Sequence, residues 1–227
     1  MNKKALVYNI MQFPDKIKLF NDGIQKEAYA VGIEVEYFVP FRPGLFRIID
    51  DFTHLIISGS EVSARADMPW TEELTRLINI FVKKVKKILG ICYGHQFMAR
   101  SLSGKECVFK LPVPEYGYTK VRLTEHKLFN NITDPVCLQL HHDAVRNLPE
   151  DFKIIAENDT CIQAYQYKGM DIYGLQFHPE FGPGAAGYFL DMVKNADPDF
   201  PNFYKNDLKD ESMLEQNGLF IRNFLGL

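Results

Sequence analysis

The strongest constraint on the fold is an alternation of strand and helix signals over the first hundred residues. Four short apolar runs each have the length of one buried strand: residues 5–10, 33–39, 53–58 and 88–92. Helix signals occur at residues 15–29 and at residues 70–87, where apolar side chains recur at three- and four-residue spacing. This series predicts an α/β fold, with an open, mostly parallel sheet covered by helices on both faces.

The middle of the chain has a different pattern. From residue 105 to about residue 172, short β-like runs are separated by Pro, Gly, Asn and Asp. We expect these runs to add antiparallel strands to the edge of the sheet. Residues 172–177 (IYGLQF) are a further predicted strand.

Two helices are predicted near the C-terminus, over residues 185–194 and 212–225, with a polar linker at residues 197–210 between them. No repeat or change in composition marks a domain boundary. The 227 residues therefore predict a single domain, with a core at about residues 5–182 and a helical extension at about residues 183–227. We expect no room for a second full catalytic domain.

Composition excludes several classes of protein. With 26 Lys and Arg against 29 Asp and Glu, the net charge is −3, so the strong basic excess of a nucleic-acid-binding protein is missing. No apolar stretch approaches the roughly 18 residues of a membrane span. The four cysteines are far apart, which predicts neither a zinc site nor a disulfide framework: Cys92, Cys107, Cys137 and Cys161. We expect a cytoplasmic protein that binds no nucleic acid, membrane, metal or cofactor.

The most informative segment is Gly90-Ile91-Cys92-Tyr93-Gly94, where a predicted strand meets a predicted helix. A nucleophile at such a G-x-C-x-G turn is exposed at the carboxyl end of the strand, and the glycines allow a turn that a Cβ atom would obstruct. The amide dipoles at the start of the helix favour the thiolate. The alternative is a buried structural cysteine between two incidental glycines, but the strand–turn–helix context favours catalysis.

A candidate general base follows the strand at residues 172–177. In His178-Pro179-Glu180, the first and third side chains of an extended segment project to the same side, and Pro179 fixes the backbone between them. A carboxylate that holds an imidazole suits proton transfer from a thiol and to a leaving amine. A lone histidine at a strand end is more often structural, but its combination with the cysteine turn favours a catalytic role.

The other histidines carry weaker signals. We expect His54 to be structural and His126 to lie at the surface, whereas His95 could line a pocket beside the cysteine. The run HHD at residues 141–143 has residue types found in metal sites, but no third ligand follows at metal-like spacing. We therefore expect this run to line a ligand pocket or to shape a loop.

Together these segments resemble the class I glutamine amidotransferases, which carry a Cys–His–Glu triad on a flavodoxin-like α/β sheet. The resemblance rests on residues 90–96 (GICYGHQ) and 173–180 (YGLQFHPE). It is nearest to the glutaminase portion of GMP synthetases and to free-standing domains of that kind. Three further segments match: residues 55–60 at the family's oxyanion loop, residues 115–117 (EYG), and residues 141–143 at its H-x-D loop.

The resemblance implies a role for each matched side chain. Cys92 would be the nucleophile that forms a γ-glutamyl thioester, and His178 would be the general base and acid. Glu180 would orient His178, and Gln96 would help to hold the glutamine substrate. The implied fold is flavodoxin-like, and the chemistry requires no cofactor.

Backbone amides of Tyr93 and of Gly59 or Ser60 would form the oxyanion hole, and His141 and His142 would contribute to the substrate site. Many family members have a Gly-Gly-Pro or Gly-Pro-Gly loop where this chain has S-G-S-E. A serine restricts the backbone more than a glycine, which predicts a rearranged oxyanion loop. The same S-G-S feature occurs in a free-standing branch that includes plant γ-glutamyl peptidases.

Three functions remain open at this point. The leading one is hydrolysis of the glutamine side-chain amide, with ammonia passed to a separate ATP-dependent synthetase. The second is a γ-glutamyl peptidase or hydrolase, which shares the chemistry up to the thioester but releases a peptide or conjugate amine. The third is a non-catalytic regulatory module on the same fold, and the intact triad argues against it.

Overall fold

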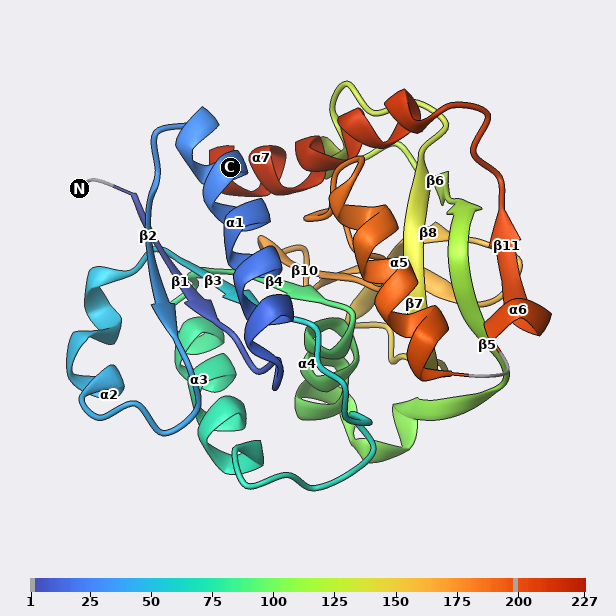
Figure 1. Cartoon of the computed structure of the whole chain (residues 1–227). Helices are drawn as coiled ribbons and strands as arrows, with labels where there is room; N and C mark the ends of the chain where they lie inside the picture. The colour runs from blue at the N-terminus through green and yellow to red at the C-terminus, as the bar shows by residue number, and fades with distance from the viewer. Residues whose placement is uncertain (1–2, 198–199) are drawn as a thin grey trace.

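The computed structural model describes residues 3–197 and 200–227 (Figure 1). Its main feature is an eight-stranded sheet. Five of its strands are parallel neighbours, in the order β2 (Glu34–Phe38), β1 (Lys4–Tyr8), β3 (His54–Ile57), β4 (Lys87–Ile91) and β10 (Ile172–Leu175). Three antiparallel strands continue the sheet: β9 (Ile162–Tyr167), β8 (Phe152–Glu157) and β6 (Arg122–Leu123). The predicted open, mostly parallel sheet is therefore confirmed.

A second sheet has three strands, in the order β11 (Tyr204–Asn206), β5 (Val108–Lys120) and β7 (Val136–Val145). The prediction that the middle of the chain extends the main sheet is correct for β9, β8 and β6 but wrong for β5 and β7. These two long strands form a separate antiparallel ladder, because side chains such as Tyr116 and Leu138 bury one of its faces in the core. The predicted linker at residues 197–210 contributes β11, which pairs in parallel with β5.

Helices cover both faces of the main sheet, as predicted (Figure 1). Four of them pack on the parallel strands: α1 (Pro14–Ala30), α3 (Thr71–Lys83), α4 (Tyr93–Ser103) and α7 (Gly218–Gly226). The helices α1 and α7 share one hydrophobic core with Val7, whereas α3 and α4 share another core with Leu6. Neighbouring strand residues thus point to opposite faces, which is why the central strands β1, β3 and β4 are mostly apolar, whereas the edge strand β2 is only partly buried.

The C-terminal part contains α5 (Ala185–Ala196), which confirms the helix predicted at residues 185–194. The helix predicted at residues 212–225 is α-helical only in α7, because the preceding segment Glu211–Asn217 forms a 3₁₀ helix. Two short helices complete the order, α2 (Leu45–Ile48) and α6 (Phe200–Phe203). Among the described helices, none combines the length and the hydropathy that a membrane span requires.

Candidate active site

Cys92 lies in the sharp turn between β4 and α4. Its φ of 52° and ψ of −102° are a strained conformation for a residue other than glycine. A Cβ atom on Gly90 would lie 2.5 Å from the carbonyl carbon of Gly94, and one on Gly94 would lie 2.5 Å from the carbonyl oxygen of Ile57. Both glycines of the G-x-C-x-G pattern are therefore required by close backbone packing. The turn is held further by the Cys92 N–H, which donates to the Leu175 carbonyl at 2.8 Å.

His178 and Glu180 follow β10, the parallel neighbour of β4. The Nδ1 atom of His178 is 2.7 Å from Oε1 of Glu180, and both side chains are buried. The Cys92 sulfur interacts electrostatically with the same imidazole, and both side chains line one cavity. The three side chains therefore form a continuous chain of contacts from thiol to imidazole to carboxylate.

The charge environment favours a protonated His178. Burial by itself would lower the pKa of His178, but the Glu180 carboxylate and the Cys92 sulfur raise it to about 10. Aromatic rings exclude water on one side, because Phe181 and Phe189 lie with their centroids 5.4 and 5.9 Å from that of His178. The geometry suits transfer of a proton between the Cys92 thiol and His178, which would make the sulfur a nucleophile.

Neutralising Glu180 is expected to lower the pKa of His178. In the wild type, the pKa is raised above the usual 6.5, so the stability that protonated His178 contributes is present below pH 6.5 and is lost as the pH rises through about 10. NMR titration of the imidazole should show a midpoint near 10 in the wild type and a lower one in Glu180→Gln. Equal midpoints in the two proteins would contradict this account of the pair.

A glycine of α1 allows the helix to approach Glu180. A Cβ atom on Gly23 would lie 2.2 Å from the Glu180 carbonyl oxygen. Sequence reasoning missed this residue, because a glycine inside a helix does not by itself show what packs against it.

We expect Gly23→Ala to lower the free energy of unfolding by about 1–3 kcal/mol, because backbone must move to admit the methyl group. The control is Gly187→Ala in α5, where a Cβ atom would meet nothing within 4 Å and where alanine is expected to stabilise the helix by up to about 1 kcal/mol. Urea unfolding of both variants measures the difference. A Gly23→Ala protein as stable as the wild type would contradict the close packing.

A cavity of about 550 Å³ opens over Cys92. Seven of the nine side chains predicted for the site line this cavity: Ser60, Cys92, Tyr93, Gln96, His141, His142 and His178. Glu180 lies behind His178, and Gly59 packs beside the triad, where a Cβ atom would be 3.1 Å from Cε1 of His178 and 3.7 Å from Cβ of Cys92. The structure thus brings all nine residues to one place.

Two residues that line the cavity have a backbone N–H group without an acceptor in the described part of the chain. The N–H groups of Ser60 and Tyr93 have no protein acceptor within residues 3–197 and 200–227, and both residues line the cavity with Cys92. Gly59 and Ser60 have no positive φ. Ser60 therefore imposes no left-handed backbone strain. Backbone strain at this serine gives no reason for the rearranged oxyanion loop that the sequence predicted.

The cavity also has an apolar wall that sequence reasoning did not assign to the site. It is formed by one face of α5, which contributes Phe189, Met192, Val193 and Ala196. Their three- and four-residue spacing places them on one face of a helix. What the spacing could not indicate is that this face covers the cavity.

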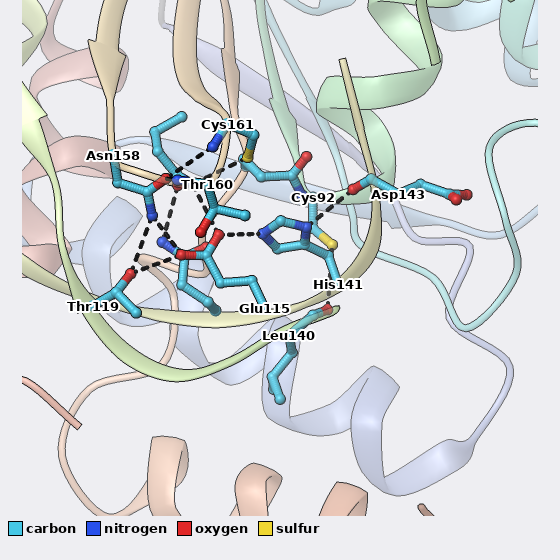
Figure 2. Close-up of polar contacts among 12 residues, drawn as sticks. Cys92, Glu115, Thr119, Leu140, His141, Asp143, Asn158, Thr160 and Cys161 are labelled. Carbon is cyan, nitrogen blue, oxygen red and sulfur yellow. Dashed lines mark hydrogen bonds and ion pairs between the residues drawn. The ribbon is translucent and has the colours of Figure 1, made fainter. Parts of the chain in front are cut away.

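Behind the cavity lies a buried polar network centred on Glu115 (Figure 2). Its Oε1 atom accepts hydrogen bonds from Thr119 at 3.1 Å and from Asn158. Its Oε2 atom accepts from His141 at 3.0 Å and from Gln163 at 3.2 Å. The carboxylate is thus held by four donors, and Glu115 lies directly opposite His141 in the pairing of β5 with β7.

Both ring nitrogens of His141 face hydrogen-bond acceptors. Its Nδ1 atom faces the Asp143 carbonyl oxygen at 3.0 Å, and its Nε2 atom faces the Glu115 carboxylate. Both partners are oxygen atoms, and the Glu115 carboxylate lies opposite the imidazole. His141 and Glu115 therefore form a buried ion pair at the edge of the cavity. The residues 115–117 entered the sequence reasoning only through a family resemblance, so the pair itself was missed.

The sulfur of Cys161 lies close enough to this pair to raise the question of a metal. One ligand atom each from Glu115, His141 and Cys161 lie within 4.8 Å of one another. Burial raises the pKa of the Cys161 thiol far above its usual value, whereas metals bind the thiolate. Both Glu115 oxygens and both His141 nitrogens are already engaged in hydrogen bonds. This chemistry favours a hydrogen-bond network over a metal site.

Gln96 extends inward from the first turns of α4. Its Nε2 atom donates to the Asp143 carbonyl at 2.7 Å and to Oε1 of Gln176 at 3.1 Å. These bonds fix the side-chain amide and leave its carbonyl oxygen as the group that can accept from a substrate.

The remaining histidines lie outside the cavity. The prediction that His95 could line the pocket is wrong: its side chain is fully buried against Tyr165, with ring centroids 4.7 Å apart, and burial lowers its pKa to about 3. His54 is buried in β3 as a structural residue. His126, predicted at the surface, is partly buried, because it accepts a hydrogen bond from the Leu128 N–H and packs on Tyr173.

A strained cysteine after a parallel strand, a buried histidine–carboxylate pair and two free N–H groups form a site of the kind that cysteine-dependent hydrolases use. Comparison with known proteins is consistent with this class. The sequence model of the family "Glutamine amidotransferase class-I" matches residues 13–193. The chain belongs to this family.

Among individual proteins, the chain is similar to GMP synthases. The chain is 38% identical to a glutamine-hydrolysing GMP synthase subunit from Methanocaldococcus jannaschii over 130 residues, which is 56% of this chain and 67% of that one. It is 48% identical to the glutamine-hydrolysing GMP synthase of Clostridium perfringens over 111 residues, 45% of this chain. The matched region spans only 21% of the length of that relative.

Solved structures confirm the fold. The structure of a glutamine amidotransferase from Thermotoga maritima superposes with a TM-score of 0.77, covering 99% of this chain and 97% of that one. Its sequence identity is 19%, so the likeness concerns the fold alone. The predicted flavodoxin-like α/β architecture is confirmed by this likeness.

Proposed function

We propose that the chain hydrolyses the side-chain amide of glutamine through a cysteinyl thioester. The single observation that carries the proposal is the contact chain from Cys92 through His178 to Glu180 at the floor of the cavity. Membership of the class I glutamine amidotransferase family supports glutamine as the substrate.

In this proposal each residue has a defined step. The Cys92 thiolate attacks the amide carbon, and the N–H groups of Tyr93 and of Ser60 or Gly59 bind the oxygen that becomes negative. His178, protonated and held by Glu180, donates its proton to the leaving nitrogen as the C–N bond breaks. His178 then takes a proton from water, which attacks the thioester and releases glutamate from the sulfur.

The substrate contacts are also proposals. Gln96 lines the cavity with its Nε2 atom already bonded, and the His141–Glu115 pair holds the cavity edge in one position. His142 lines the same cavity, with its Nε2 atom 2.6 Å from the Tyr116 hydroxyl. These groups would orient the amino-acid end of glutamine while its amide lies over Cys92.

A separate ATP-dependent synthetase is the proposed acceptor of the ammonia. The Methanocaldococcus jannaschii relative is named as one subunit of a glutamine-hydrolysing synthase, which supports a partner protein here. The proposed location is the reducing cytoplasm, since the four cysteines form no disulfide.

The apolar wall favours a second candidate, hydrolysis of γ-glutamyl conjugates. Phe189, Met192 and Val193 line the same cavity as His178, and Phe189 packs against its ring. His178 is the group that would protonate a leaving amine. An amine with an apolar substituent could pack against this wall. The chemistry up to the thioester would be the same as for glutamine.

Ammonia release from glutamine by the purified full chain, with and without candidate synthetases, tests the proposal. Competition between glutamine and a series of γ-glutamyl dipeptides separates the two candidates, because the better substrate inhibits turnover of the other. A chain that consumes neither under any of these conditions would contradict both and favour the non-catalytic alternative.

A further inference from the structure

Two serine hydroxyls connect the loop after β3 to the loop after β1. Ser58 Oγ accepts from the Ile10 N–H at 2.9 Å and donates to the Gly59 carbonyl at 2.7 Å. Ser60 Oγ donates to the Ile10 carbonyl at 3.0 Å. The backbone of Ser58 is hydrogen-bonded as well: its N–H donates to the Tyr8 carbonyl, and its carbonyl accepts from the Gly94 N–H. We call this set of bonds the serine clasp.

The serine clasp determines which way the peptide between Gly59 and Ser60 faces. In a trans peptide the C=O and the N–H point in opposite directions. Because Ser58 Oγ holds the Gly59 carbonyl, the Ser60 N–H points away from that hydroxyl. Ser60 lines the cavity with Cys92. A reversed peptide would break the bond from Ser58 and would present a carbonyl oxygen where the oxyanion needs a donor.

We infer that the serine clasp holds the Ser60 N–H toward the oxyanion position in the free chain, so that glutamine hydrolysis does not wait for a partner protein. Ser58 and Ser60 are then positioning residues, and their hydroxyls act through the peptide between them. The inference rests on the proposed hydrolysis of glutamine and adds how that site is kept active.

The two serines of the clasp differ in burial. Ser58 is fully buried, and without its hydroxyl the N–H of buried Ile10 loses its acceptor. Ser60 is partly exposed at the cavity, so threonine can supply the same hydroxyl there. The two positions therefore allow both a loss and a rescue experiment.

The test compares Ser58→Ala, Ser60→Ala and Ser60→Thr in the full chain, with glutamine and no added protein. We expect kcat to fall by about 10- to 100-fold in both alanine variants with KM within about twofold, because a misplaced oxyanion donor affects the transition state more than substrate binding. Ser60→Thr should recover most of kcat. The control is Ser101→Ala on α4, whose hydroxyl has no hydrogen-bond partner among the described residues and whose loss should leave kcat unchanged.

Two outcomes would overturn the inference: an unchanged kcat in both alanine variants, or a Ser60→Thr protein as slow as Ser60→Ala. If Ser58→Ala does not fold, the comparison of Ser60→Ala with Ser60→Thr tests the inference.

Two measurements on the wild-type chain, ammonia release and labelling of Cys92, distinguish a failure of this inference from a failure of the proposed function. If the free chain releases no ammonia but a chloroketone analogue of glutamine labels Cys92, the proposed function stands and activity without a partner is overturned. If neither reaction occurs, the proposed function itself fails.

Discussion

Cys92→Ala is expected to abolish ammonia release from glutamine, lowering kcat/KM by at least about 10⁴-fold. No other group can form the thioester, and loss of the nucleophile in a triad removes nearly all of its benefit at once. Cys92 sits at φ 52° in a turn that alanine can occupy with the same backbone strain, so the fold should be retained. Initial rates of ammonia release measure the effect, and thermal unfolding checks the fold.

The matched control for this experiment is Cys107→Ala. Cys107 is also buried, but it belongs to the core on the other face of the sheet and does not line the cavity. Its replacement should cost some stability and leave kcat close to that of the wild type. Residual activity in Cys92→Ala comparable with that of Cys107→Ala would exclude the thioester mechanism.

Glu115→Gln is expected to lower the free energy of unfolding by about 3–5 kcal/mol. Breaking one partner of a buried ion pair leaves the other charge uncompensated, in this case His141. The substituted amide would also turn an NH₂ group toward donors that now face a carboxylate oxygen (Figure 2). Urea unfolding at neutral pH measures the loss, and Glu150→Gln at an exposed position should change stability by less than about 0.5 kcal/mol.

The same variant should show a distinct pH dependence. Burial would raise the pKa of Glu115, but hydrogen bonds from His141 and Asn158 hold it below its usual 4.5. Because the folded pKa is lowered, the stability that Glu115 contributes is present above pH 4.5 and is lost as the pH falls through the lower, folded pKa. The difference in stability between wild type and Glu115→Gln should therefore shrink below pH 4.5. A difference that stays constant would contradict the ion pair.

Much of the architecture was predictable because its causes are local. A parallel strand buried on both faces is an apolar run, and an amphipathic helix such as residues 71–83 shows its buried side at three- and four-residue spacing. The second sheet was not predictable in this way. Whether β5 joins the main sheet or pairs with β7 depends on contacts between residues 16 to 37 positions apart, from Lys120–Val136 to Val108–Val145, which no local pattern records.

The two central motifs of the site were visible for the same reason. In residues 90–94 and 178–180, the functional side chains are neighbours along the chain, so a tight turn is enough to hold them in place. The expected extended conformation at residues 178–180 is wrong, because β10 ends at Leu175 and residues 179–180 form a turn. His95 shows the limit of this reasoning. It is three residues from the nucleophile, yet the rotation of α4 directs it away from the cavity and into the core.

The sequence by itself determined the class of fold, the position of the cysteine turn and the histidine–carboxylate pair. Tertiary structure alone decided which residues surround them: the Glu115–His141 ion pair across two strands, the wall formed by α5 and the serine clasp to Ile10. The physical reason is that secondary structure arises from neighbouring residues, whereas burial, ion pairing and the orientation of a peptide depend on contacts that form only when distant segments pack together.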